Sequence, residues 1–229
     1  MMYIFLISLI SWIFPLISPD LKNKPEIIFD GKDVSQLRAY KSDLFPDDAW
    51  EVSEGAIKTK TIKNNVDLVT RNRYKDFDLS FEWKVSKAGN SGVFFHVQED
   101  FSHQSGNGNS PNWLQNFEFQ ILDDIDFPDK TPNRSAGSVY DLITPENKSL
   151  KPVGAYNTAR IIVKKAKVTH YINGRKIIQY TIGSPEMNQL IAKSKFKDKK
   201  DFGAYKEGHI MFQHHGQEVW YKNITIKKL

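Results

Sequence analysis

The sequence predicts an all-β protein, built as a sandwich or jelly roll of two antiparallel sheets. After Pro19, no stretch sustains the apolar spacing of a long amphipathic helix, while short runs rich in β-branched and aromatic residues recur between turn signals. Hydrophobic residues make up 40% of the 229 residues and aromatic residues 13%, which is enough for a core between two sheets. We expect one domain over residues 20–229.

The expected strands are bounded by residues that favour turns. Asn173-Gly174 separates two of them and predicts a tight hairpin, because both residues tolerate positive φ. Asn90-Ser91-Gly92 and residues 203–206 mark turns in the same way. In chain order, strands are expected at residues 77–85, 93–98, 117–122, 159–165, 168–172, 176–182, 209–213 and 219–227.

The strand at residues 117–122 carries the main functional signal. Its apolar side chains, Phe117, Phe119 and Ile121, alternate with Glu118 and Gln120. A carboxylate and a carboxamide in line suit an open polar groove. Both groups hydrogen-bond to hydroxyl-rich ligands, and the carboxylate can also move a proton. This face of the strand therefore points to carbohydrate.

The same alternation selects side chains from two other strands. In residues 93–98, the apolar positions leave His96 on the polar face, and in residues 209–213 they leave Gln213, with His215 following. We therefore expect His96, Glu118, Gln120, Gln213 and His215 to share one concave surface.

Two long polar loops flank the Glu118 strand. Residues 102–112 are rich in Gly and Asn and precede Trp113, and residues 123–138 contain four aspartates and two prolines. Loops of this length often carry function, and the alternative is a variable surface insertion.

Residues 3–17 are almost wholly apolar, a length typical of a signal-peptide hydrophobic region and short for a membrane-spanning helix. We expect residues 1–19 to be a signal peptide that directs the chain to the periplasm or outside the cell. An uncleaved N-terminal membrane anchor is the alternative, because no Lys or Arg precedes the run and no Ala-x-Ala site closes it. With no cysteine, the chain forms neither disulfides nor a lipid-modified cysteine anchor.

The charge pattern does not predict a nucleic-acid partner. The formal charge of +5 arises mostly from lysines spread along the chain. The densest basic stretch, residues 193–200, includes Phe196 and Asp198 and is interpreted as a solvated loop.

No metal or cofactor is expected. The histidines lack the paired spacing of a zinc site. The aspartates after residue 122 lack the regular spacing and the glycine of a calcium-binding loop, and a calcium ion bound in that loop is kept as the alternative. The oligomeric state is not predicted.

A set of short motifs, each weak alone, occurs in a specific order across residues 27–229. They are Ile28-Phe29-Asp30-Gly31-Lys32-Asp33, Trp50-Glu51-Val52, Asn90-Ser91-Gly92-Val93-Phe94-Phe95-His96, Glu118-Phe119-Gln120-Ile121-Leu122-Asp123, Tyr140-Asp141-Leu142-Ile143-Thr144-Pro145, Lys151-Pro152-Val153-Gly154, Asn157-Thr158-Ala159-Arg160-Ile161, His170-Tyr171-Ile172-Asn173-Gly174, Gly208-His209-Ile210-Met211-Phe212-Gln213-His214-His215-Gly216 and Trp220-Tyr221-Lys222-Asn223-Ile224. In this order the chain resembles the bacterial 3-keto-disaccharide hydrolase family.

The resemblance implies a concanavalin-like β-sandwich with its ligand on the concave face of one sheet. It also implies a sugar substrate already oxidised at C3. Three positions depart from the family pattern: Leu37 replaces a frequent tryptophan, Lys222 replaces arginine, and His214 replaces a common aspartate.

The implied substrate sets the chemistry. A C3 ketone acidifies the C2 proton, so that the C1 oxygen can leave by β-elimination and water can then add to the enone. Such a site needs a base, an acid and a donor for the developing enolate, rather than the paired carboxylates of ordinary glycosidases. We expect Glu118 with His96 or His215 to handle the protons, and Asn90, Gln120 and Gln213 to hold hydroxyls.

Three further residues are candidates for binding the substrate. Asp123 either orients a neighbour or binds sugar, and Tyr140 and Trp113 offer stacking surfaces for a pyranose ring. The alternative function is a non-catalytic, lectin-like carbohydrate-binding module on the same fold, which the fold alone does not separate from an enzyme.

Overall fold

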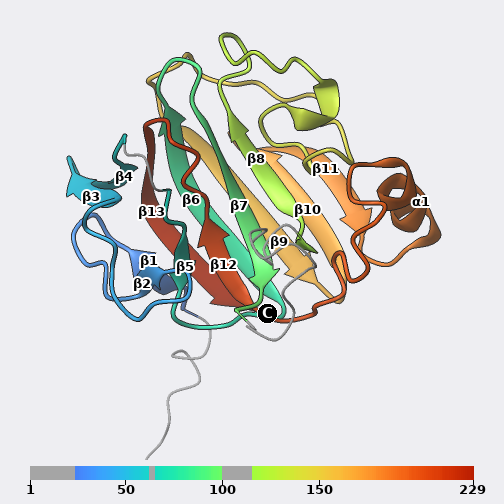
Figure 1. Ribbon diagram of the computed structural model, residues 1–229, viewed down its shortest axis with the longest axis horizontal. Coiled ribbons are helices and arrows are strands. Elements are labelled where there is room, and N and C mark those ends of the chain that lie inside the picture. The colour runs from blue at the N-terminus through green and yellow to red at the C-terminus, as the bar shows by residue number, and fades with distance from the viewer. Residues whose placement is uncertain (1–23, 62–64, 100–114) are drawn as a thin grey trace, which may run out of the picture.

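The computed structural model describes residues 24–61, 65–99 and 115–229. In these residues two antiparallel sheets pack face to face, which confirms the predicted all-β sandwich (Figure 1). The larger sheet has eight strands, in the order β11-β10-β9-β6-β13-β4-β3, with β1 also paired to β13. The smaller sheet has five, in the order β2-β5-β12-β7-β8.

The elements with their bounds are β1 (Glu26–Phe29), β2 (Leu37–Ala39), β3 (Trp50–Ser53), β4 (Ala56–Thr59), β5 (Leu68–Thr70), β6 (Phe77–Val85), β7 (Asn90–Val97), β8 (Glu118–Leu122), the 3₁₀ helix η3 (Pro132–Arg134), β9 (Asn157–Lys164), β10 (Lys167–Ile172), β11 (Arg175–Thr181), α1 (Pro185–Lys193), β12 (His209–Phe212) and β13 (Val219–Lys228). The predicted hairpin at Asn173-Gly174 joins β10 to β11, with φ of 48° and 77°.

The first five strands and α1 were not predicted. Each of these strands has only three or four residues, too few for a clear alternation. Helix α1 has nine residues and buries only Met187. It begins where the Ser184 side chain accepts the Met187 N–H (3.2 Å). Within the described ranges, no helix combines the length and apolar character needed to span a membrane.

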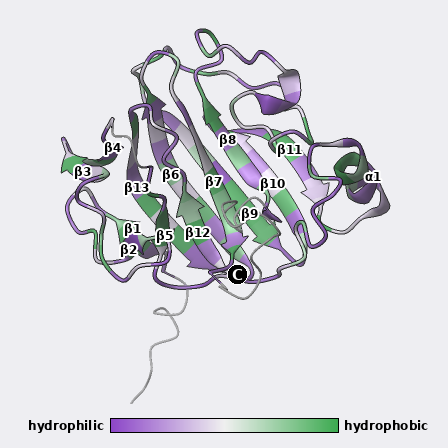
Figure 2. Ribbon diagram, viewed as in Figure 1, coloured by the Kyte–Doolittle hydropathy of each residue, from purple (hydrophilic) through white to green (hydrophobic). Residues whose placement is uncertain are grey.

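The core lies between the sheets. Along β6, buried residues alternate strictly with partly exposed ones, so that Phe77, Phe81 and Val85 all face the smaller sheet. The Phe81 ring meets those of Phe119 and Phe212 edge to face, with centroids 6.0 and 6.2 Å apart. Figure 2 shows the resulting mixture of hydrophobic and hydrophilic positions along the paired strands.

The segment at residues 137–143 lies along the free edge of β8. Gln120 N–H donates to Ser138 O (3.2 Å), Gly137 N–H donates to Gln120 O (2.8 Å), and Tyr140 N–H donates to Glu118 O (3.1 Å). These contacts provide hydrogen-bond partners for backbone groups on the edge of β8, which would otherwise be unpaired. It also differs from the open groove expected from the sequence, because every residue of β8 is buried, including Glu118 and Gln120.

Candidate active site

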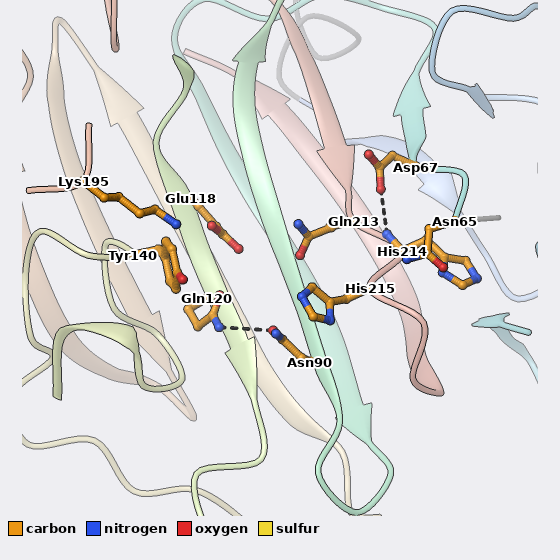
Figure 3. A pocket seen from close by; sticks show the side chains of 10 residues that line it. All are labelled: Asn65, Asp67, Asn90, Glu118, Gln120, Tyr140, Lys195, Gln213, His214 and His215. Carbon is orange, nitrogen blue, oxygen red and sulfur yellow. Dashed lines mark hydrogen bonds between the residues drawn. The ribbon is translucent and has the colours of Figure 1, made fainter. Parts of the chain in front are cut away.

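A cavity of about 440 Å³ lies on the face of the smaller sheet that points away from the core (Figure 3). Its floor comes from neighbouring strands, β7 and β8, and from the chain just after β12. Loops from elsewhere in the sequence form its walls. The lining residues are Asn65, Asp67, Asn90, Glu118, Gln120, Tyr140, Lys195, Gln213, His214 and His215.

Glu118 is the buried carboxyl of this cavity. Burial raises its pKa to about 8, while the charge of Lys195 lowers the pKa and that of Asp67 raises it. The carboxyl lies over Gly92 of the neighbouring strand, where a Cβ atom would overlap Glu118 Oε1. At neutral pH Glu118 is therefore mostly protonated and able to donate a proton, as a raised carboxyl pKa permits.

Gly92→Ala tests this close approach. The added methyl is expected to push the flexible Glu118 carboxyl aside rather than the backbone, since Oε1 is the nearest atom. Turnover should fall about 100-fold, with little change in the melting temperature. In a Glu118→Gln background the same substitution should cause no further loss of turnover, because the misplaced group is already gone. An independent, additive loss would contradict the assignment.

Two amides that line the cavity with Glu118 hydrogen-bond to each other. Gln120 Nε2 donates to Asn90 Oδ1 (3.2 Å), whereas Gln120 Oε1 is buried without a hydrogen-bond partner among the described residues. A buried acceptor of this kind is costly unless a ligand satisfies it. A sugar hydroxyl that donates to Gln120 Oε1 would do so. Gln213 and Asn65 add two further amides to the cavity (Figure 3).

Lys195 and Tyr140 form the wall beside Glu118. The Lys195 ammonium lies 4.0 Å from the centroid of the Tyr140 ring, a cation–π contact. Loss of water lowers the pKa of Lys195, and burial together with the charge of Glu118 raises the pKa of Tyr140. The interpretation of residues 193–200 as a solvated loop missed Lys195. The aromatic neighbour Phe196, which is buried, was the available signal that the chain turns inward there.

His215 supplies an imidazole on the other side of the cavity (Figure 3). Its Nδ1 lies 3.0 Å from Gln217 Oε1. Because an amide oxygen only accepts, Nδ1 carries the proton in the neutral ring and Nε2 keeps its lone pair. His215 is exposed, which leaves this nitrogen accessible to a substrate as a base.

The neighbouring His214 has a structural role. Its Nδ1 accepts the Gly216 N–H (3.2 Å), so Nε2 carries the proton and donates to Lys60 O (2.9 Å). Both ring nitrogens are therefore occupied by backbone. Burial lowers the pKa of His214, which keeps the ring neutral. The departure from the family pattern at this position thus fixes the chain path before His215.

Asp67 was not singled out from the sequence. It lies just before β5, and its Oδ1 accepts the His214 N–H (2.7 Å). Burial raises the pKa of Asp67 to about 6. Figure 3 shows Asp67 and Glu118 on opposite sides of Gln213. We read Asp67 as a support for the strand end that carries Gln213 and His215.

The prediction that His96 shares this surface is wrong. A register shift between β7 and β12 places His209 opposite Val97 and Met211 opposite Phe94, and His96 takes up the extra residue with φ of 58°. Because of this bulge, the side chains of β7 no longer alternate between the two faces of the sheet at His96, and the His96 ring does not point into the cavity that holds Glu118. The His96 ring packs against Phe77 (6.1 Å) with Nε2 2.8 Å from Lys75 O, and it lines a different cavity.

Asp123 does not reach the cavity either, which contradicts its expected contact with the substrate there. It is 2% exposed, and its carboxylate accepts N–H donors from Ala88 (2.8 Å), Ile125 (2.9 Å) and Asp126 (3.1 Å). Burial acts to raise the pKa of Asp123, but these donors bring it below its ordinary value. Asp123 therefore organises two turns, which agrees with its predicted orienting role.

Two sequence predictions concern other loops. Trp113 and residues 102–112 lie outside the described residues. In the acidic loop, Asp124 pairs with Lys148 (2.6 Å) and Asp129 pairs with Arg134 (3.0 Å). The described ranges hold no cluster of three or more His, Asp or Glu residues able to bind a metal ion.

The cavity of this two-sheet sandwich is lined by two carboxyls, two imidazoles, a lysine and four amides, a polar set that suits a hydroxyl-rich ligand such as a carbohydrate. Residues 24–227 match the family model described as a 3-keto-alpha-glucoside-1,2-lyase-like domain, and the chain belongs to this family. Its recognition from ordered motifs is thereby confirmed. The chain is 34% identical over 226 residues to the 3-keto-disaccharide hydrolase of Bacteroides thetaiotaomicron. The aligned region covers 88% of this chain and 77% of that protein.

Solved structures agree with this assignment. A crystal structure from Parabacteroides distasonis, assigned as a glycosyl hydrolase, superimposes with a TM-score of 0.81 at 27% identity, over 92% of this chain and 95% of that one. A carbohydrate-binding module from Bacillus subtilis superimposes with a TM-score of 0.51 at 9% identity, over 84% of this chain and 96% of the module, which shows the fold alone. The family match, the Bacteroides relative and the Parabacteroides structure support a glycoside hydrolase.

Proposed function

We propose that the chain is an exported enzyme that cleaves 3-keto-disaccharides by elimination across C2 and C1, followed by hydration of the enone. The observation that carries this proposal is the buried Glu118 carboxyl, whose pKa burial raises to about 8, facing the cavity that also holds His215. The names of the family and of the Bacteroides relative support the substrate class. The word lyase in the family description supports cleavage by elimination.

In the first step His215 Nε2 takes the C2 proton. The electron pair of that C–H bond moves toward C3, whose oxygen becomes an enolate and is stabilised by the Lys195 ammonium. The C1–O bond then breaks as Glu118 gives its proton to the leaving oxygen. The products are the released alcohol and an enone with its double bond between C1 and C2.

Hydration reverses the two proton transfers. The Glu118 carboxylate takes a proton from water as the water oxygen adds to C1, and the His215 imidazolium returns a proton to C2. Both side chains end in their starting protonation states. Asn90, Gln120 and Gln213 hold the hydroxyls, and Tyr140, with Lys195 over its ring, forms the wall beside them.

The pH dependence of kcat/KM tests the role of Glu118. Because the acid must carry its proton, activity should fall about tenfold per pH unit above about 8, the pKa of Glu118. If Glu118 acted as a base instead, kcat/KM would rise with pH through the same pKa, because the carboxyl would have to lose its proton. Measurement of kcat/KM from pH 5 to 10 on a purified 3-keto-disaccharide distinguishes the two.

The rival function is a lectin-like module without catalysis. Incubation of the purified protein with a panel of 3-keto-disaccharides, followed by chromatography of released sugar, separates the two functions. The enzyme should release free sugar from at least one member, and Glu118→Gln should not. Binding of these sugars without release by the unaltered protein would favour the module.

Export is a further part of the proposal and is independent of the site. It rests on the apolar run at residues 3–17, which lies outside the described residues. N-terminal sequencing of the protein recovered from a periplasmic fraction should begin near residue 20. Recovery of the full chain with the membranes would favour the uncleaved anchor instead.

A further inference from the structure

Lys195 reaches the cavity on a segment that is tied down at one point by Asp141. The Lys195 backbone N–H donates to Asp141 Oδ2 (2.9 Å). The other oxygen, Oδ1, accepts from Arg134 Nε (2.7 Å) and Nη2 (2.6 Å). One carboxylate therefore joins the segment after α1 to the loop that carries Tyr140.

Arg134 is itself held in place. Its Nη1 donates to Asp129 Oδ2 (3.0 Å), and its guanidinium lies 5.7 Å from the centroid of the Tyr140 ring. The Asp141 side chain is only 8% exposed, so its charge is compensated by these contacts rather than by water.

The backbone at Asp141 is strained. Its φ of 62° is in the left-handed region, which residues other than glycine rarely adopt. The conformation is supported by the Asp141 N–H, which donates to Asn133 O (2.8 Å). Such strain persists where surrounding contacts over-determine it, and it often marks functional sites.

We propose that Asp141, fixed by Arg134, is a positioning residue that holds Lys195 over Tyr140 and beside Glu118. The role in catalysis rests on the proposed function, whereas the placement of Lys195 does not. Asp141 touches no reacting atom and acts through Lys195.

The placement has a consequence at Glu118. The charged and titratable groups that act on this carboxyl are Lys195, which lowers its pKa, and Asp67, which raises it, while the Glu118 charge in turn raises the pKa values of Tyr140 and Tyr221. If Asp141 no longer holds Lys195 in place, the pKa of Glu118 should rise above about 8.

The test compares Asp141→Gly, which relieves the φ strain and removes the clamp, with Asp129→Asn, which removes the charge of the second partner of Arg134 and keeps an oxygen that can accept the Thr131 N–H. Glu118 is titrated by ¹³C NMR of glutamate labelled at Cδ, with Glu118→Gln identifying the resonance. In Asp141→Gly the midpoint should move to higher pH, and kcat on a 3-keto-disaccharide should fall at least tenfold with little change in KM. Asp129→Asn should change neither.

Asp141→Asn provides a second variant, because asparagine tolerates the left-handed backbone but cannot serve both partners. A Glu118 midpoint that stays unchanged in both Asp141 variants, with melting temperatures near that of the unaltered protein, would overturn the proposal. So would an equal shift in Asp129→Asn. The titration needs no substrate, so it decides the placement even if no 3-keto-disaccharide is cleaved.

Discussion

Glu118→Gln is expected to lower kcat by about 10²–10⁴-fold and, at the same time, to stabilise the folded protein at alkaline pH. The loss of turnover follows because glutamine fills the same space but has no proton to give to the leaving oxygen. Steady-state kinetics on a 3-keto-disaccharide measures the first effect. Activity within a few-fold of the unaltered enzyme would remove Glu118 from the mechanism.

The gain in stability follows from the sign of the pKa shift. The folded-state pKa of Glu118 is raised to about 8 from an ordinary value of 4.5. Between these values the unfolded chain loses its proton while the folded chain keeps it, so the free energy of unfolding falls as pH rises. Each pKa unit corresponds to about 1.4 kcal/mol. Thermal denaturation should therefore show a higher melting temperature for Glu118→Gln at pH 8–9, and nearly equal values at pH 4.

The second large effect is expected from Lys195→Met, which keeps an unbranched apolar side chain of nearly the same length but removes the charge. Without the ammonium the enolate loses its stabilising donor, and kcat should fall about 10²–10³-fold. The alkaline limb of the pH profile should also move to higher pH, because Lys195 lowers the pKa of Glu118.

Lys197→Met is the matched control for this substitution. Lys197 lies two residues further along the same segment and is exposed like Lys195, but it does not line the cavity. It should keep the kinetics and the pH profile of the unaltered protein. Equal losses in the two variants would indicate a general effect of charge rather than a role for Lys195 at the reacting atoms.

Where the alternation of side chains continues without interruption, the sequence predicted the site. Phe119 and Ile121 face the core, and Glu118 and Gln120 face the cavity with Asn90 and Gln213, because a two-residue period assigns faces directly. The sandwich itself follows from the same periodicity and from turn residues such as Asn173-Gly174.

Alternation failed where the structure depends on pairing between distant strands. The bulge at His96 arises from the register of β7 against β12, which are more than 100 residues apart, and nothing in residues 93–98 alone reveals it. Lys195 and Asp67 lie in loops that approach the cavity only through tertiary packing. Apart from the aromatic Phe196 beside Lys195, the local sequence pattern contains no information about such approaches.

The most direct test of the account is cleavage of a 3-keto-disaccharide in D₂O, with the product examined by NMR and mass spectrometry. Elimination moves the C2 proton to the exposed His215 ring, where it exchanges with solvent before hydration returns a proton to C2, so the released 3-keto sugar should carry deuterium at C2. Controls without enzyme, and with authentic 3-keto sugar plus Glu118→Gln, measure background exchange. If the product contains no more deuterium at C2 than these controls, elimination would be contradicted and direct hydrolysis at C1 indicated.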